Sequence, residues 1–230
     1  LENASNREKQ AAFATLEAMN DSRADSLLAE WMKRLTDDKV PAAVRLDLLE
    51  AASQRAKAEI TTLAPLVEKY LSAKSPSDPL AAWLECLEGG RPEEGRSVVL
   101  NSTAGACLRC HIVRDKGGNV GPELNGIGKR YDRRTILESI VAPNAKIAEG
   151  FQSVVLGLKD GTVVAGVLRK ETPEEVLVMT AEAKLVAVPA KDIEERAKGI
   201  SAMPADLATK LSKKEIRDVV EFLSRLREKE

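Results

Sequence analysis

Two cysteines and a histidine stand together near the middle of the chain, in the run Cys107-Leu108-Arg109-Cys110-His111. Cysteines three positions apart, followed at once by a histidine, form the C-x-x-C-H pattern of covalent haem attachment. Each thiol can add to one vinyl group of the macrocycle, while the imidazole presents a nitrogen to the iron. The pattern therefore predicts one covalently held haem c, with His111 as its proximal ligand.

Three other interpretations of this run are open. A thioredoxin-like redox pair needs a strand before its first cysteine, but residues 101–106 contain no strand-like run. A zinc site needs four ligands, for which Cys86 is the third thiol of the chain; Cys110 and His111 are adjacent, however, and reach one tetrahedral ion awkwardly. A chance occurrence, in a chain that binds nothing, is disfavoured by the residues that follow His111.

Those following residues form a glycine-rich segment, Gly117 to Arg130, which includes Gly117-Gly118 and Gly121-Pro122-Glu123-Leu124-Asn125-Gly126. So much glycine argues against a helix or a regular strand. A glycine-rich backbone can approach a flat ligand closely. The segment therefore suits a loop that covers one face of a haem.

With this loop the chain resembles the class I cytochromes c, in which C-x-x-C-H is followed by G-P-x-L-x-G and then by a basic residue. The resemblance implies that the carbonyl of Pro122 accepts a hydrogen bond from the proximal His111. Such a bond fixes the orientation of the imidazole and raises its basicity. The resemblance also implies that Leu124 packs on the porphyrin and that Arg130 lies near a propionate.

The same resemblance points to the second axial ligand. His111 is the only histidine, so a second histidine of this chain is excluded. Met19 and Met32 lie on amphipathic helical stretches, and Met179 lies in a β-rich run. Met203 lies in a loop just before the last helix, where class I cytochromes carry their distal methionine. We therefore predict ligation by His111 and Met203, with an open or water-bound iron as the alternative.

Composition sets the broad class of the chain. Its 230 residues exceed one small cytochrome, so further modules are expected. The net charge of −1 gives no basic field that would attract nucleic acid or an anionic membrane. No apolar run approaches the roughly 18 residues of a membrane-spanning helix, and no signal-peptide pattern stands at the start. Since the chain does not begin with Met, we expect a processed protein or part of a longer one.

The hydrophobic periodicity predicts a mainly α chain with a small antiparallel β module. The resemblance implies that the fold is the class I cytochrome c helical fold, with the β module inserted in it and a helical segment at its N-terminal side. Residues 1–90 read as successive short helices, similar to the end of a HEAT-type array or to a small helical cap. Residues 91–230 form the predicted cytochrome domain, interrupted by a β insertion at 150–193. Capping boxes are expected at Ser5 and Ser212. Four strands are expected at 151–158, 162–168, 175–180 and 184–188, with a hairpin turn at Asp160-Gly161.

The segment from Pro92 to Leu226 is also similar to a haem-binding domain of planctomycetes and verrucomicrobia. That domain commonly ends long secreted proteins that carry a sugar-dehydrogenase-like β-propeller and HEAT-like repeats. The resemblance implies a periplasmic or other extracytoplasmic location and a redox partner or fused dehydrogenase domain. The matching pieces are Cys107 to His111, Gly117-Gly118, Gly121 to Leu124, Glu138 to Ile140, Pro143-Asn144, Gly150-Phe151, Asp160-Gly161, Ser201 to Pro204 and Leu211-Ser212.

The expected function is one-electron transfer through a His/Met-ligated haem, without acid-base catalysis by the protein itself. The alternative is a haem sensor or a small peroxidase-like enzyme with an open sixth position. Such a peroxidase would need a distal histidine, and none remains once His111 binds the iron. A helical-repeat scaffold with an ancillary haem is a third hypothesis, for which the sequence offers no marked binding patch. The third thiol, Cys86, is expected to be a buried apolar residue, with an intermolecular disulfide as the lesser alternative.

Overall fold

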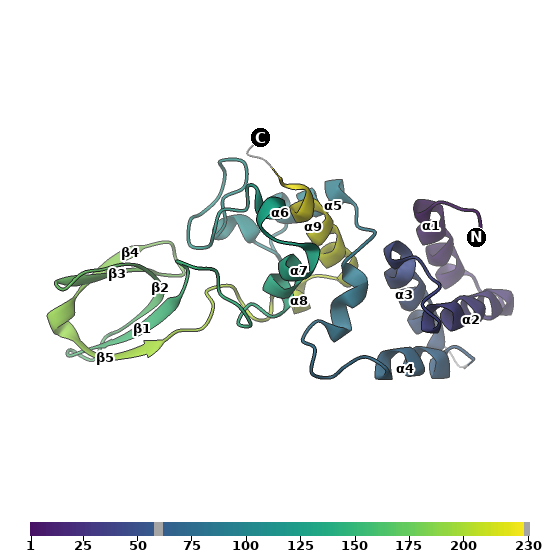
Figure 1. The fold of residues 1–230 in the computed structure, drawn as a ribbon, viewed down its shortest axis with the longest axis horizontal. Coiled ribbons are helices and arrows are strands. Elements are labelled where there is room, and N and C mark those ends of the chain that lie inside the picture. Colours follow the sequence, from purple (N-terminus) through teal and green to yellow (C-terminus); the bar gives the residue numbers. More distant parts are fainter. Residues whose placement is uncertain (58–61, 228–230) are drawn as a thin grey trace.

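The computed structural model describes residues 1–57 and 62–227. The elements lie in three groups along the long axis of the molecule: an N-terminal helical segment, a central helical body, and a curled sheet at the far end (Figure 1). The α-helices are α1 (Asn6–Ala18), α2 (Ser22–Thr36), α3 (Arg45–Ala56), α4 (Ala64–Ser72), α5 (Pro92–Asn101), α6 (Ile127–Arg130), α7 (Arg133–Val141), α8 (Leu207–Lys210) and α9 (Lys213–Arg225). The 3₁₀ turns are η1 (Ala42–Val44), η2 (Ala81–Cys86), η3 (Cys107–Arg109) and η4 (Ala190–Asp192). The strands are β1 (Ser153–Leu158), β2 (Val163–Glu171), β3 (Glu175–Met179), β4 (Leu185–Pro189) and β5 (Ile193–Lys198).

The N-terminal segment, α1 to α4, has an apolar core of its own. Phe13 and Trp31 meet there edge to face, with ring centroids 5.4 Å apart. The predicted capping box at Ser5 is confirmed, since its hydroxyl accepts from the Glu8 N–H while the Glu8 carboxylate accepts from the Ser5 N–H. The assignment of these helices to a HEAT-type array stays a prediction.

Between this segment and the central body, the sequence predicted a fifth helix around Trp83. The structure has the 3₁₀ helix η2 there instead. This segment connects two helical groups, and 3₁₀ turns are frequent in connectors, although six residues is long for a 3₁₀ helix. Leu80 and Cys86 are buried in the central core although they precede residue 91.

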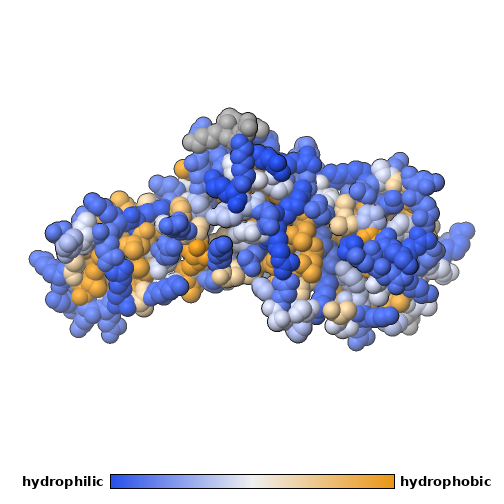
Figure 2. Space-filling view, in the orientation of Figure 1, coloured by the Kyte–Doolittle hydropathy of each residue, from blue (hydrophilic) through white to orange (hydrophobic). Residues whose placement is uncertain are grey.

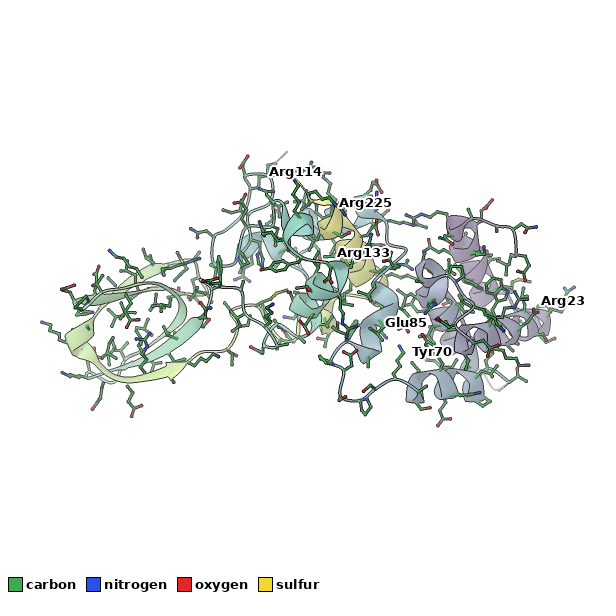
Figure 3. All side chains as sticks on the ribbon, in the orientation of Figure 1. Arg23, Tyr70, Glu85, Arg114, Arg133 and Arg225 are labelled. Atoms are coloured by element: carbon green, nitrogen blue, oxygen red, sulfur yellow. The ribbon has the colours of Figure 1, made fainter. Side chains whose placement is uncertain are left out.

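Polar side chains tie the N-terminal segment to the central body. The Arg217 guanidinium of α9 pairs with the Asp47 carboxylate of α3 at 2.6 Å, with both side chains more than nine-tenths buried. Tyr70 and Glu85, labelled in Figure 3, meet at this boundary, where the Tyr70 hydroxyl donates to the Glu85 carboxylate at 2.6 Å. Burial alone would raise the pKa of Glu85, but hydrogen bonds from Lys74 and Tyr70 outweigh it and lower the pKa.

The central body is built on the crossing of α5 and α9. Gly95 lies at the crossing, where a Cβ atom would stand 1.9 Å from the carbonyl oxygen of Asp218. The predicted helix at Pro92–Asn101 and the capping box at Ser212 are both confirmed. Arg133 at the start of α7, labelled in Figure 3, donates to the Glu221 carboxylate of α9 at 2.6 Å and so fixes α7 on that helix.

The sheet is antiparallel throughout, in the order β4-β3-β2-β1-β5. The turn at Asp160-Gly161 joins β1 to β2 as predicted, and Gly161 takes a left-handed φ of +84°. The sheet curls so that β3 and β4 lie across from β1 and β5 (Figure 1). Its small interior core consists of Val154, Leu156, Val176, Val178 and Val188.

The prediction of four strands, the last at 184–188, is wrong, because a fifth strand, β5, pairs with β1. This strand reads Ile193-Glu194-Glu195-Arg196-Ala197-Lys198 and is exposed along almost its whole length. A charged edge strand has no buried face, so it lacks the alternating apolar residues by which strands are recognised.

The prediction of a mainly α chain with a small β insert is also wrong. About 47% of the described residues are helical and about 15% are in strands. The sheet has five strands and an interior core, so the fold is α/β. The sequence indicated four of the five strands. The fifth strand and the interior core of the sheet depend on pairings between segments, which local periodicity does not record.

Apolar residues are visible on the sheet and on the central body in Figure 2, among a surface that is otherwise mostly hydrophilic. Large exposed apolar side chains include Val163, Leu185 and Ile200. Within the part of the chain that the structure describes, no helix combines the length and apolar composition needed to cross a bilayer.

Candidate functional site

The C-x-x-C-H run forms one tight turn after α5. Ala106 has a left-handed φ of +44° and leads into η3, in which the Cys110 N–H donates to the Cys107 carbonyl at 3.2 Å. Residues three apart in a 3₁₀ turn project to the same side. This is why Cys107 and Cys110 line the same cavity. Both are free thiols, and burial raises the pKa of Cys107.

The His111 ring is oriented by a single backbone oxygen. Its Nδ1 lies 2.7 Å from the carbonyl oxygen of Pro122. A carbonyl oxygen only accepts, so Nδ1 carries the proton and Nε2 keeps its lone pair in the neutral ring. Burial lowers the pKa of His111, although the hydrogen bond to Pro122 acts in the opposite direction. The lowered pKa favours the neutral ring, whose Nε2 carries no proton.

The loop that supplies the Pro122 carbonyl lies directly against the turn of residues Cys107 to His111, which is called the clamp turn below. The N–H groups of Gly118, Gly121 and Leu124 donate to carbonyls of residues 108, 110 and 112, at 2.8 to 2.9 Å. A Cβ at Gly121 would stand 2.5 Å from Cε1 of the His111 ring. Only glycine lets the loop come this close, so Gly121 is part of the site.

The far end of this loop is held by Asn125 and Arg130. The buried Asn125 side chain accepts from the Arg114 N–H at 2.9 Å and donates to the Glu123 carboxylate at 2.6 Å. Arg130 donates to the carbonyls of Asn125 and Glu123, at 3.0 and 2.6 Å. Its guanidinium thus supports the loop, and Arg130 does not line the cavity.

Met203 is held by a second loop, which follows the sheet. The Met203 N–H donates to the Ser201 hydroxyl at 3.2 Å, and the Ser201 N–H donates to the Asn144 side chain at 2.8 Å. Asn144 lies just after α7, so this bond joins the segment that leads into the sheet to the segment that leaves it. The sheet is thereby inserted without displacing Met203 from the central body.

These segments enclose a cavity of about 200 Å³. Of the seven residues named from the sequence, six line it and Arg130 does not. The rest of the wall is mostly apolar and comes from α5 to α9, the segment after α7 and the sheet. The six are Cys107, Cys110, His111, Pro122, Leu124 and Met203.

The sequence did not indicate what the sheet contributes to this wall. Phe151, just before β1, and Val167 of β2 both line the cavity. Phe151 belongs to the Gly150-Phe151 piece of the resemblance, but nothing in the sequence marked it or Val167 as part of the cavity wall. Gly121 was visible in the Gly-Pro motif, but its contact with the imidazole was not.

The structure does not assemble the alternative zinc site. Cys86 is fully buried in the central core, and its thiol donates to the Lys213 carbonyl at 3.4 Å. Burial raises the pKa of Cys86 to about 12, as befits an inert buried thiol. Across residues 1–57 and 62–227, no three side chains of His, Cys, Asp and Glu gather as metal ligands. The segment before Cys107 is helix α5 and a turn, which is not the strand that a thioredoxin-like pair requires.

Comparison with known proteins finds no family model that matches this chain and no curated protein that matches it. The chemistry of the site therefore rests on its own geometry.

Proposed function

We propose that this chain is a c-type cytochrome, in which Cys107 and Cys110 hold one haem by thioether bonds and His111 and Met203 are its axial ligands. The observation that carries the proposal is the 2.7 Å hydrogen bond from His111 to the Pro122 carbonyl. It leaves Nε2 as the free ligand atom in a cavity that two free thiols and a methionine also line.

The residues present fit this cofactor. The ring nitrogen, the two thiols and the thioether belong to the ligand types that proteins use for haem. The cavity wall is mainly apolar, which suits a flat macrocycle. Its volume of about 200 Å³ lies below the roughly 300–1,000 Å³ of common ligand sites, so part of the macrocycle would extend through the mouth.

The haem would supply a one-electron redox couple, and the protein would supply its position and its electrostatics. A methionine as second ligand raises the reduction potential, which suits an electron acceptor after the oxidation of an organic substrate. By the resemblance described above, the donor is a dehydrogenase partner or a fused dehydrogenase domain. By the same resemblance we propose that the protein acts outside the cytoplasm, in the periplasm or at the cell surface.

Covalent attachment is tested with cysteine variants expressed together with the cytochrome c maturation machinery. The parent and the Cys86→Ala control should keep haem on the chain after denaturation and acid-acetone extraction. Cys107→Ala and Cys110→Ala each remove one thioether bond, and the double variant should lose all covalent haem. Retention of haem by the double variant, equal to that of the parent, contradicts the assignment.

Axial ligation is tested by spectroscopy of the loaded protein. We expect a low-spin spectrum with the weak far-red sulfur-to-iron band in the oxidised state. Met203→Ala should abolish that band, while Met19→Ala, a change at a half-exposed residue of the N-terminal segment, should retain it. Rapid binding of carbon monoxide by the ferrous parent would contradict ligation by Met203 and favour a sensor with an open sixth position.

A further inference from the structure

Arg169 of strand β2 reaches across to the loop that orients His111. Its Nη2 donates to the carbonyls of Asn119 and Val120, the second at 3.2 Å. The guanidinium also stacks over the Phe151 ring, 4.9 Å from its centroid. The aromatic face and the two carbonyls together hold this side chain in one orientation.

Apolar packing supports the same connection. Val120 of the loop is 1% exposed and packs with Val167 and Met179, which are cross-strand partners in β2 and β3. Cys110 and Phe151 pack against this cluster. The sheet therefore contacts both the loop and the clamp turn, although it is far from them in the sequence.

The route from Arg169 to the imidazole is short. Val120 is followed by Gly121, whose N–H donates to the Cys110 carbonyl and at which a Cβ would stand 2.5 Å from the His111 ring. The next residue, Pro122, supplies the carbonyl that accepts from Nδ1. Since proline restricts the backbone, fixing the carbonyls of Asn119 and Val120 limits how far the Pro122 carbonyl can move.

We propose that Arg169 is a positioning residue, through which the sheet holds the Pro122 carbonyl on His111 and so tunes the reduction potential of the site. This inference rests on the proposed function. A well-held carbonyl makes the imidazole a more basic ligand, which favours the oxidised iron. Loss of Arg169 loosens the carbonyl and raises the potential.

The direction of this shift separates positioning from simple charge. Removal of a positive charge near the iron, without any movement of the loop, favours the oxidised state and lowers the potential. Arg169→Gln should instead raise the potential. At a fixed applied potential the ratio of reduced to oxidised protein should increase about threefold, where a tenfold increase would correspond to a shift of 59 mV. The matched control is Lys170→Gln, which removes a charge from the exposed next residue of the same strand.

A second measurement does not depend on the haem. The Gly121 N–H donates to the Cys110 carbonyl at 2.8 Å, so its hydrogen exchange reports how well the loop is held. We expect hydrogen exchange at Gly121 to be about tenfold faster in Arg169→Gln than in Lys170→Gln. The loop should open more easily once its contact with the Arg169 guanidinium is lost. Arg169→Lys retains a donor but not the planar guanidinium, so it should give an intermediate exchange rate and a potential near that of the parent.

The outcomes separate the two proposals. If the parent takes up no haem, the proposed function fails, while exchange at Gly121 still decides whether Arg169 holds the loop. If haem is bound but Arg169→Gln matches Lys170→Gln in both exchange and potential, the positioning role is overturned. If Arg169→Gln does not fold, the test uses Arg169→Lys. Hydrogen exchange at Gly121 that is equal in Arg169→Lys and Lys170→Gln would then overturn the proposal.

Discussion

At the scale of single residues, one hydrogen bond decides what His111 can do. A neutral imidazole has two tautomers, and a ring without a fixed partner presents either nitrogen as the ligand. The Pro122 carbonyl selects the tautomer with the proton on Nδ1. Because the same bond restrains rotation of the ring, it also directs Nε2, and pre-organisation of this kind lowers the free-energy cost of ligation.

Gly121 makes that geometry accessible, and its replacement tests the geometry. In Gly121→Ala the new Cβ would lie 2.5 Å from Cε1 and 2.9 Å from Nδ1 of His111, so the ring or the loop must shift. We expect a loss of about 1–3 kcal/mol in stability and a lower ratio of haem absorbance to protein absorbance. Thermal unfolding and the absorbance of purified protein measure the two effects.

Gly157→Ala is the matched control for this substitution. It lies on strand β1, where the nearest atom to a new Cβ is the Cβ of Glu195 at 3.4 Å. This variant should retain the stability and haem content of the parent. If Gly121→Ala behaves in the same way, the imidazole does not lie against Gly121 in solution.

At the scale of elements, the crossing of α5 and α9 determines the shape of the cavity, because Val99 of α5 and both Val219 and Leu223 of α9 line it. The two helices approach closely only because Gly95 has no side chain. Each helix is marked locally in the sequence, by Pro92 at the first position of α5 and by the capping box at Ser212. The distance between the two helices depends on the contacts that they make with each other, which neither segment shows by itself.

The Gly95→Ala variant gives a prediction with an unusual sign. Alanine in place of glycine within a helix normally stabilises by about 0.5–1 kcal/mol. Here the new Cβ would lie 1.9 Å from the Asp218 carbonyl oxygen and 2.9 Å from the Phe222 Cβ, so we expect a net loss of about 1–3 kcal/mol. Urea unfolding followed by far-UV circular dichroism measures it.

The control for this element is Arg96→Ala, at the exposed next position of α5. Surface substitutions of this kind stay within about 0.5 kcal/mol. A Gly95→Ala protein that is more stable than the parent would show that α5 and α9 are further apart than in the structure.

At the scale of the whole molecule, a buried ion pair joins the N-terminal segment to the helix that closes the cavity. Arg217 and Asp47 are 170 positions apart in the sequence and meet at 2.6 Å, with side chains 5% and 9% exposed. Arg217 has one further carboxylate nearby, that of Asp218 at 3.8 Å. The Asp218 carboxylate accepts instead from the Arg91 N–H at 2.7 Å, so this neighbour is a weak substitute for Asp47.

Asp47→Asn tests the importance of this pair. Removal of one partner leaves a buried guanidinium without its main counter-charge, which we expect to cost about 3 kcal/mol. The control is Lys214→Gln, which removes the more exposed pair with Glu50 at 3.1 Å and should cost less than about 1 kcal/mol. Denaturant titration measures both, and equal small losses would mean that the N-terminal segment is held mainly by apolar contacts.

The sequence by itself determined those features whose chemistry lies within one turn or one loop. The spacing of Cys107, Cys110 and His111 places both thiols on one side of a turn, and the caps at Ser5 and Ser212 need only residues three positions apart. The turn at Asp160-Gly161 was predictable for the same reason. In each case the interacting atoms are neighbours along the chain, so residue type and spacing nearly fix the geometry.

The tertiary structure decided everything that depends on contacts between distant segments. The exposed strand β5 forms because it pairs with the edge of β1. The Arg217–Asp47 pair forms because the N-terminal segment packs against the central body. Arg169 contacts the loop because the sheet lies beside that loop. None of these residues has a local signature, since an arginine or a glutamate on a solvated strand looks the same with or without a partner. Such contacts form only when the whole chain brings the segments together, and the free energy that selects them belongs to the packed molecule.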